Sequence, residues 1–506
     1  MASCSLMGLR THTVGNTAAL LSGLLMLLLA PVMLLLAPAD ALSQSVDDKM
    51  LQALLASHGQ EPLQSPPFTV DDKYILGQAL YFDPVLSGAR EVACATCHLP
   101  IRGTSNAQAL AVGVDGQRLG EFRLTGGRGN ETPRNSPDIW NRGHPDVENM
   151  FWDGRVALDE DAIREARYVD KDDTTLYFES PMADRFPDGV ENLLAAQALF
   201  PVTGVDEMLG RPGDRSDQEL PDDHANLPNE LAKAAMGTDG PRRIQRVHEA
   251  LVERLFAPDL SATDVDEDGE LELKEWQKAY RRLANAAYPE LSLSELSIIE
   301  VVNAIGHYEK IAFATRNAPW DDYLRGNRQA ISASAKAGAL VFFGKGKCAT
   351  CHSGPLFSDF EFHSLAVRQI GPGKNISSDD LGRYHVTADE DDLYKFRTPP
   401  LRNVTLSAPY FHDGVAITLR AAIRHHNDPL NLADSEFADG THSWNIGKRK
   451  SVSYILAAGL NLTDTEINQL VTFLKTLEDD LADLMPEIVP VSVPSGLPVA
   501  ALYDHY

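Results

Sequence analysis

The string CATCH occurs twice in this chain, at residues 94–98 and 348–352. Each copy presents two cysteines three positions apart, with a histidine directly after the second cysteine. Side chains three positions apart lie on one face of a helical turn, so each copy gathers two thiols and places an imidazole beside them. This feature constrains the fold more than any other, because the chain has to be built around what these side chains bind.

The pattern C-x-x-C-H is the attachment signal of a c-type haem: each thiol adds to a vinyl group, and the histidine becomes the proximal ligand of the iron. A thioredoxin-like redox pair does not require the histidine in both copies. A structural zinc site needs four ligands in one place, whereas the two copies lie far apart in the chain. We therefore predict two covalently bound c-type haems, held by Cys94, Cys97, His98, Cys348, Cys351 and His352.

The N-terminal segment indicates export. Arg10 precedes an apolar run over residues 18–37, and the small residues of APADALSQ suit cleavage after Ala41. We predict a signal peptide over 1–41 and a periplasmic protein, and the length of the run leaves an uncleaved membrane anchor as the alternative. The fifth cysteine, Cys4, lies in this segment. In an oxidising compartment the other four would tend to form disulfides unless something, here haem attachment, consumes them.

The charge of the chain limits its partners. The 506 residues carry a formal net charge of −27, which excludes nucleic acid because phosphate binding needs a basic surface. An acidic surface fits docking to a basic protein, or serves solubility alone. Hydrophobic residues make up 43% of the chain, which is normal for a soluble globular protein with room for two or three domains.

Helical periodicity dominates the chain, and strand patterns are few. We predict a mainly α protein with two cytochrome c-type haem domains and an inserted EF-hand-like calcium loop. The stretch LSLSELSIIEVVNAIGHYEKIAFA predicts a long amphipathic helix capped by Ser292 or Ser294. The predicted parts after the signal peptide are the first haem domain (42–250), the insertion (251–286), a connecting helix (287–330), the second haem domain (331–482) and an extended Pro-rich tail (483–506).

The stretch DVDEDGELELKE, residues 264–275, matches an EF-hand loop position by position. Gly269 falls at position 6, where the loop turns sharply, and helical sequences flank the stretch on both sides. An acidic solvated loop, the alternative, would not explain both the glycine and the closing glutamate. We predict calcium binding, with a structural rather than a sensor role, by Asp264, Asp266, Asp268, Glu270 and Glu275, with Glu272 at position 9.

Beyond the two haem strings, the chain resembles the bacterial di-haem cytochrome c peroxidases and their relative MauG. The resemblance covers most of residues 70–480, apart from insertions after Val156 and near 210–290. It implies two mainly helical cytochrome c domains related by a pseudo-twofold axis. The matching stretches are LGQALYFDPVLSG, PRNSPDIWN, FWDGR and FRTPPLRNVTLSAPYFHDG.

The resemblance makes the first haem, with His98 proximal, the peroxidatic one. AAQALFPVTGVDEM resembles the family segment with a glutamine and a glutamate over the open haem face, which implies catalytic roles for Gln197 and Glu207. Trp152 matches the family tryptophan between the haems and is implied to relay electrons. The alternatives are an exposed helix-start acid for Glu207 and a core aromatic for Trp152. No histidine precedes PRNSP where peroxidases carry a releasable ligand, so we expect an open first iron and interpret His144 as a loop residue.

For the second haem, the family pattern places the distal ligand at His426 within RHHND, with His425 as the alternative. The family carries methionine or tyrosine there. Two histidines should lower the haem potential relative to methionine ligation. The resemblance also implies a calcium ion between the domains, held by Asn135, Ser407 and Pro409.

These features favour an exported di-haem peroxidase. It would reduce hydrogen peroxide to water with electrons relayed from the second haem, delivered by a small periplasmic cytochrome c or copper protein. The alternatives are MauG-like oxidation of a partner protein and a non-catalytic electron carrier. An open first iron and a second iron without methionine favour the MauG-like variant, whereas Gln197 and Glu207 speak against a plain carrier. The sequence leaves a homodimer open.

Overall fold

A computed structural model of the protein describes residues 39–127, 129–157, 187–216, 220–257, 273–371, 373–374, 379–430, 451–480 and 485–500. The chain divides into two compact units, residues 1–53 and 54–506. Of the first unit the structure describes the opening of helix α2 (Ala39–Ser57). The second unit holds both CATCH strings, and the predicted domain borders within it stay predictions.

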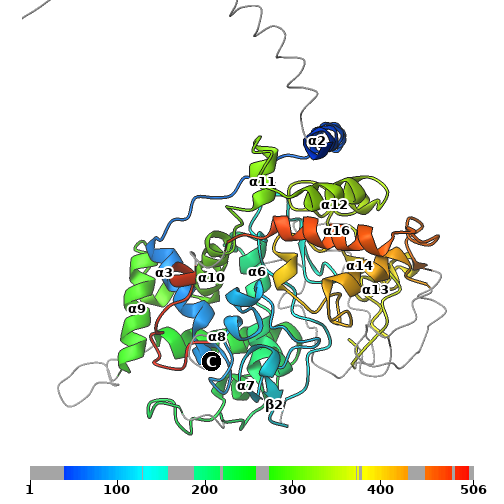
Figure 1. Ribbon diagram of the computed structural model, residues 1–506. Helices are drawn as coiled ribbons and strands as arrows, with labels where there is room; N and C mark the ends of the chain where they lie inside the picture. The colour runs from blue at the N-terminus through cyan, green and yellow to red at the C-terminus, as the bar shows by residue number, and fades with distance from the viewer. Residues whose placement is uncertain are drawn as a thin grey trace, which may run out of the picture. The chain divides into compact units, whose positions relative to one another are not determined.

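The second unit is mainly helical, as predicted (Figure 1). Its described strands form three short antiparallel pairs, β1 (Gly116–Gln117) with β2 (Leu124–Thr125), β3 (Asn149–Met150) with β4 (Val156–Ala157), and β5 (Phe362–His363) with β6 (Phe396–Arg397). The α-helices described here are α3 (Asp72–Phe82), α4 (Cys94–Cys97), α6 (Leu193–Ala198), α7 (Glu230–Ala234), α8 (Gly240–Phe256), α9 (Glu275–Ala287), α10 (Ile298–Ala312), α11 (Pro319–Leu324), α12 (Ala333–Phe343), α13 (Tyr384–Thr387), α14 (Leu419–Asn427), α16 (Asp464–Leu474) and α17 (Met485–Ile488).

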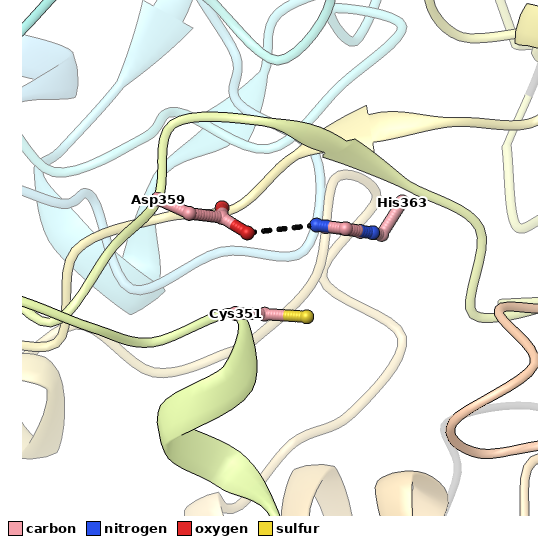
Figure 2. Close-up of side chains that lie close together, drawn as sticks. All are labelled: Cys351, Asp359 and His363. Atoms are coloured by element: carbon pink, nitrogen blue, oxygen red, sulfur yellow. Dashed lines mark hydrogen bonds and ion pairs between the residues drawn. The ribbon is translucent and has the colours of Figure 1, made fainter. Parts of the chain in front are cut away.

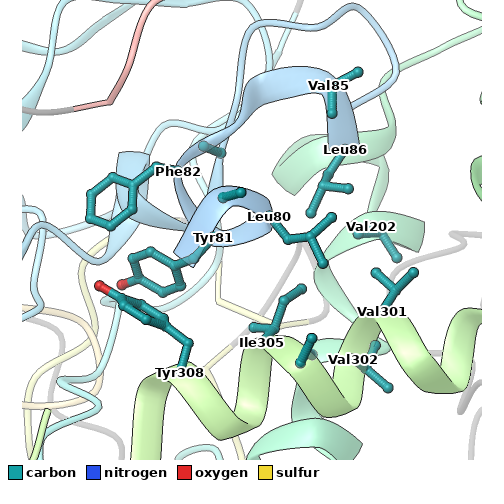
Figure 3. Packing of buried hydrophobic residues seen from close by; sticks show 14 of the residues in the cluster. Leu80, Tyr81, Phe82, Val85, Leu86, Val202, Val301, Val302, Ile305 and Tyr308 are labelled. Carbon is teal, nitrogen blue, oxygen red and sulfur yellow. The ribbon is translucent and has the colours of Figure 1, made fainter. Parts of the chain in front are cut away.

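The core around the first CATCH string is built on α3 and α10, which pack against each other. Gly77 of α3 permits this contact, because a Cβ at that position would lie 1.9 Å from the carbonyl oxygen of Ala304 on α10. Figure 3 shows the buried side chains of both helices interleaved, from α3 Leu80, Tyr81 and Phe82 and from α10 Val301, Val302, Ile305 and Tyr308. The close approach fixes α3, whose end leads into the first CATCH turn.

Helix α10 begins later than predicted. Its N-cap is Ser297, which forms a capping box with Glu300, and neither Ser292 nor Ser294 caps it. Ser292 instead pairs with Glu295 around a separate 3₁₀ turn, η6 (Leu293–Glu295). The prediction of the cap was wrong because the stretch contains two overlapping serine–glutamate boxes, and only the second continues into the helix.

The second CATCH string rests on a similar helix pair. Helix α12 packs against α16, and a Cβ on Gly338 would lie 2.0 Å from the carbonyl oxygen of Gln469. Helix α16 starts with a capping box between Thr463 and Glu466. In both halves a glycine therefore lets a long helix approach the helix that leads to the haem-attachment string.

The C-terminal segment 485–500 packs against the first core. The predicted extended tail begins with the short helix α17 and then continues without regular structure. Buried Asp83 at the end of α3 accepts hydrogen bonds from Ser495 Oγ at 2.6 Å and from Tyr280 Oη of α9 at 2.7 Å. The apolar side chains of segment 485–500 join the core cluster of α3 and α10, namely Met485, Ile488, Val493, Leu497 and Ala500. The tail is thus a structural part of the first haem half.

We predict that Ile488→Ala lowers the free energy of unfolding by about 2–5 kcal/mol, because the side chain is fully buried and its removal leaves a cavity. Val491 lies three residues further on the same segment with its side chain fully exposed. Val491→Ala should therefore change stability by no more than about 0.5 kcal/mol. Urea unfolding of the haem-loaded protein compares the two variants, and equal small effects would contradict the docking of the segment.

Candidate functional site

Both CATCH strings fold into the same local turn. The first forms α4, and the backbone N–H of His98 donates to the carbonyl oxygen of Cys94 at 3.0 Å. The second begins with the 3₁₀ turn η7 (Cys348–Thr350), and the N–H of His352 donates to the carbonyl oxygen of Cys348 at 2.8 Å. No disulfide joins any of the four cysteines of the two strings. Each turn therefore presents two thiols and an imidazole together.

The histidine of each CATCH string is oriented by a backbone carbonyl group a few residues further along the chain. Nδ1 of His98 donates to the carbonyl oxygen of Thr104 at 3.1 Å, and Nδ1 of His352 to that of Phe357 at 3.0 Å. Burial lowers the pKa of both imidazoles, that of His352 to about 4, so both are neutral near neutral pH. A neutral imidazole with Nδ1 hydrogen-bonded keeps Nε2 as the metal ligand.

Each turn opens on a large cavity. The empty space, including the part open to solvent, is about 1280 Å³ at the first string and about 1720 Å³ at the second. One wall is common to both cavities, and it consists of Asn135, Ser136, Pro137, Asp138, Trp152 and Arg397. In this wall the indole N–H of buried Trp152 donates to the carbonyl oxygen of Asn135 at 2.9 Å. The predicted relay residue thus lies between the two cavities.

The first cavity contains both predicted catalytic side chains. Gln197 comes from α6, and Glu207 from a single π turn, η5 (Val205–Leu209). Burial raises the pKa of Glu207 and the neighbouring Asp206 adds to this, whereas Arg155, which also lines the cavity, acts to lower that pKa. The structure therefore brings an amide and a half-buried carboxyl to the cavity that His98 lines.

His98 is the one histidine among the described residues that line the first cavity. His144 does not line it; its Nδ1 accepts a hydrogen bond from the backbone N–H of Asp146 at 3.2 Å. Among the described residues His98 is thus the one imidazole at this cavity, and the open first iron stays a prediction.

Of the two candidate histidines of α14, His426 lines the second cavity and His425 does not. The imidazoles of His352 and His426 both line it, with ring centroids 6.4 Å apart. Two imidazoles that share one metal ion at about 2 Å from each nitrogen have centroids roughly 6 Å apart. Nδ1 of His426 donates to the carbonyl oxygen of Ala422, which leaves Nε2 available, whereas Nε2 of His425 donates to the carbonyl oxygen of Leu365. The geometry favours His426 as the distal ligand.

Other polar groups surround the second CATCH string. Nε2 of His363 lies 2.9 Å from Oδ2 of Asp359, and both side chains lie close to the thiol of Cys351 (Figure 2). We assign this group to the haem attachment site rather than to a separate metal site, because Cys351 is an attachment thiol. Buried His412 stacks on Phe396 with ring centroids 3.7 Å apart, so its ring is part of the packing around this cavity.

The two predicted calcium sites differ in what the structure describes. Asn135, Ser407 and Pro409, the ligands implied by the family resemblance, all line the second cavity. Of the EF-hand-like loop, residues 264–272 lie outside the described residues. Its closing residue, Glu275, begins α9 and forms an ion pair with Lys278 at 2.9 Å. Both calcium sites stay predictions.

Comparison with known proteins identifies the family. The sequence model described as di-haem cytochrome c peroxidase matches residues 71–329, about half of the chain. The chain belongs to the di-haem cytochrome c peroxidase family. It is 25% identical to the cytochrome-c peroxidase IdrP2 of Pseudomonas sp. strain SCT over 71% of this chain and 77% of that protein. It is also 25% identical to the methylamine utilization protein MauG of Methylorubrum extorquens, over 82% of this chain and 81% of that protein.

Among solved structures, the fold is similar to that of a MauG-like protein associated with microbial copper homeostasis. The TM-score is 0.51 at 24% identity, over 83% of this chain and 93% of that one. Family membership makes the chain a haem-dependent oxidoreductase and implies two c-type haems. The chain fits such haems, because each cavity is lined by a pair of free thiols and by a neutral histidine whose Nδ1 is already hydrogen-bonded.

Sequence reasoning missed several charged residues of the site. Arg155 and Arg397 lie inside the motifs FWDGR and FRTPPLR, and Arg142 and Asp138 lie in or next to PRNSPDIWN. All four line the first cavity. Their presence in family motifs was a usable signal, but the sequence does not show that these charges are buried.

Among the described residues, no helix combines the length and hydropathy that a membrane crossing requires. Residues 1–38, which contain the apolar run, lie outside the described part of the chain. The signal peptide and its alternative, a membrane anchor, therefore stay predictions.

We predict that His426→Ala removes the distal ligand of the second iron, whereas His425→Ala does not, because Nε2 of His425 is used by the carbonyl oxygen of Leu365. Low-temperature EPR of the resting ferric protein measures this. The low-spin signal of the second haem should be lost in His426→Ala and retained in His425→Ala. The opposite pattern would assign the ligand to His425.

Proposed function

We propose that the protein is a periplasmic peroxidase that reduces hydrogen peroxide to water at the first cavity, with electrons supplied through the second. The observation that carries the proposal is the placement of Gln197 and Glu207 in the cavity that His98 lines. The reaction consumes two electrons and two protons for each peroxide and forms two waters. The electrons come from a small periplasmic cytochrome c or copper protein, and the strongly acidic chain suits a basic donor.

When bound, the haem at His98 supplies an iron that can exchange electrons with peroxide. The side chains of the cavity handle the protons. The carboxylate of Glu207 can take the proton from the near oxygen of peroxide and deliver it to the far oxygen, which leaves as water. Burial raises the pKa of Glu207, which favours the protonated form of the carboxyl, and Arg155 opposes that rise. The amide of Gln197 offers a donor and an acceptor that can orient the peroxide.

Trp152 supports the transfer of electrons between the cavities. It lies in their common wall, and its indole is held by the hydrogen bond to Asn135. A buried aromatic ring in this position shortens the path from one cavity to the other. We propose that Trp152 relays electrons, and its packing in the wall is compatible with that role.

A second candidate function is MauG-like oxidation of a side chain in a partner protein. Two observations favour it: His98 is the one histidine among the described lining residues of the first cavity, and His426 rather than methionine faces His352 across the second. Peroxide consumption driven by a reduced cytochrome or copper donor supports the peroxidase. Consumption without such a donor, coupled to a modified partner protein, supports the MauG-like reaction.

We further propose that the EF-hand-like loop binds calcium through Asp264, Asp266, Asp268, Glu270 and Glu275, and that Asn135, Ser407 and Pro409 bind a second ion between the haem halves. The loop proposal rests on the sequence pattern. The second rests on the family resemblance and on the common position of the three residues along the second cavity.

We predict that Glu207→Gln lowers kcat/KM for peroxide by about 10²–10⁴-fold, because the amide cannot take and return a proton. Asp206 is the matched control: it is a buried acid next in sequence, but it does not line the cavity. Asp206→Asn should retain turnover close to that of the wild type. Stopped-flow measurement of the reaction with peroxide tests both variants, and an unchanged rate in Glu207→Gln would exclude the proposed role.

We predict that replacing Asp264 and Asp268 together by alanine removes one calcium ion per chain, because the loop loses two carboxylate ligands. Elemental analysis of the dialysed protein measures the calcium content of both proteins. Asp322→Ala, which removes an exposed acid elsewhere, is the control and should leave the content unchanged. Equal calcium in the double variant and the wild type would contradict a site in the loop.

A further inference from the structure

The region between the two cavities carries three charged side chains whose hydrogen bonding is incomplete. Asp138 and Arg397 line both cavities, and Arg142 lines the first. Nη2 of Arg142 donates to the carboxylate of Asp138 at 3.0 Å, and Nε of Arg397 donates to the carbonyl oxygen of Phe151 at 2.9 Å. Arg142 and Arg397 are 3% and 2% exposed, and among the described residues Asp138 is the one carboxylate that accepts a hydrogen bond from either of them.

Specific atoms of these side chains lack a partner. Nη1 of Arg142, Nη1 of Arg397 and Oδ1 of Asp138 are buried and form no hydrogen bond with the described residues. Arg134 provides the contrast in the same cavity, because its Nε, Nη1 and Nη2 all donate to Asp153 or Asp380. A buried guanidinium nitrogen without an acceptor is unfavourable, and a carboxylate is the acceptor that matches its geometry best.

We propose that Arg142 and Arg397 form a carboxylate clamp that binds the propionate groups of the bound haems. Arg142 serves the haem of the first cavity, and Arg397, which lines both cavities, serves both haems. A haem brings two carboxylates of its own, so it supplies the acceptors that the chain lacks. The proposal rests on the proposed haem occupancy, and it assigns these arginines a binding role that the catalytic proposal does not contain.

The carboxyl group of Asp138, the third of these charged side chains, is compatible with the clamp. Asp138 contributes an oxygen that already accepts from Arg142 and one that has no partner. Burial raises the pKa of Asp138, which favours a protonated carboxyl, and a protonated oxygen would donate to a propionate rather than repel it.

The clamp has a consequence for both redox centres. A positive charge beside a haem favours the reduced state, because reduction lowers the charge of the centre. A guanidinium that neutralises a propionate therefore keeps the reduction potential of that haem more positive. Its removal leaves the propionate uncompensated, so the potential of that haem shifts to more negative values.

Spectroelectrochemical titration of the haem-loaded, full-length protein tests the clamp. The variants are Arg142→Met and Arg397→Met, each with its lysine counterpart, which keeps the charge and restores part of the effect. Arg254→Met is the matched control: Arg254 is a buried arginine whose nitrogens all have partners and which lines neither cavity. Where a methionine variant fails to fold, the haem potentials of the corresponding lysine variant are compared with those of the wild type instead.

The expected result is a negative shift of the first haem alone in Arg142→Met and of both haems in Arg397→Met, with partial rescue by lysine. Potentials that move no more than in Arg254→Met would overturn the clamp. Peroxide turnover, measured in the wild type with both haems attached, separates this inference from the proposed function. Shifted potentials without turnover would support the clamp and overturn the peroxidase, and turnover with unshifted potentials would do the reverse.

Discussion

Two hydrogen bonds from imidazole Nδ1 to backbone carbonyls determine how this chain can use its CATCH strings. The bonds from His98 to Thr104 and from His352 to Phe357 fix each ring and its tautomer, so that Nε2 remains for a metal. Burial keeps both rings neutral, which a metal ligand requires. The turns, the cavities and the helices behind them can serve a metal-binding function only because these two rings are held in this orientation and protonation state.

The scaffold supports both turns by the same packing solution. Gly77 brings α3 against α10, and Gly338 brings α12 against α16, in each case with a clearance that no side chain could share. Rigid helix pairs place the attachment turns at the cavities, and the cavities meet at one wall that contains Trp152 and Arg397. A buried ion pair joins Arg134, which lines the first cavity, to Asp380, which lines the second and lies far away in sequence. The proposed electron path is short because the halves share a wall.

The local features that were predicted correctly are encoded by neighbouring residues: the two CATCH turns and the mainly helical character follow from spacing within a few positions. The cap of α10 was predicted wrongly even so, because two serine–glutamate boxes overlap there. The other features that escaped prediction depend on contacts between distant residues. The tail at Ser495 reaches Asp83 across most of the chain, and the clamp proposed for Arg397 needs a wall assembled from separate segments. Glu207 and Gln197 were placed by family resemblance, since their spacing alone does not specify a shared cavity.

The two cavities differ in the group opposite the proximal histidine, and this difference explains the proposed division of labour. Opposite His352 stands an imidazole, His426, at a centroid distance suited to a shared metal ion. A second imidazole on the metal excludes peroxide from it, so this centre is suited to electron transfer. The first cavity offers instead the amide of Gln197 and the carboxyl of Glu207, which can hold and move protons but leave a position open. Under the proposed ligation by His426, one scaffold used twice yields a closed and an open site, and the residue on the distal side decides which is which.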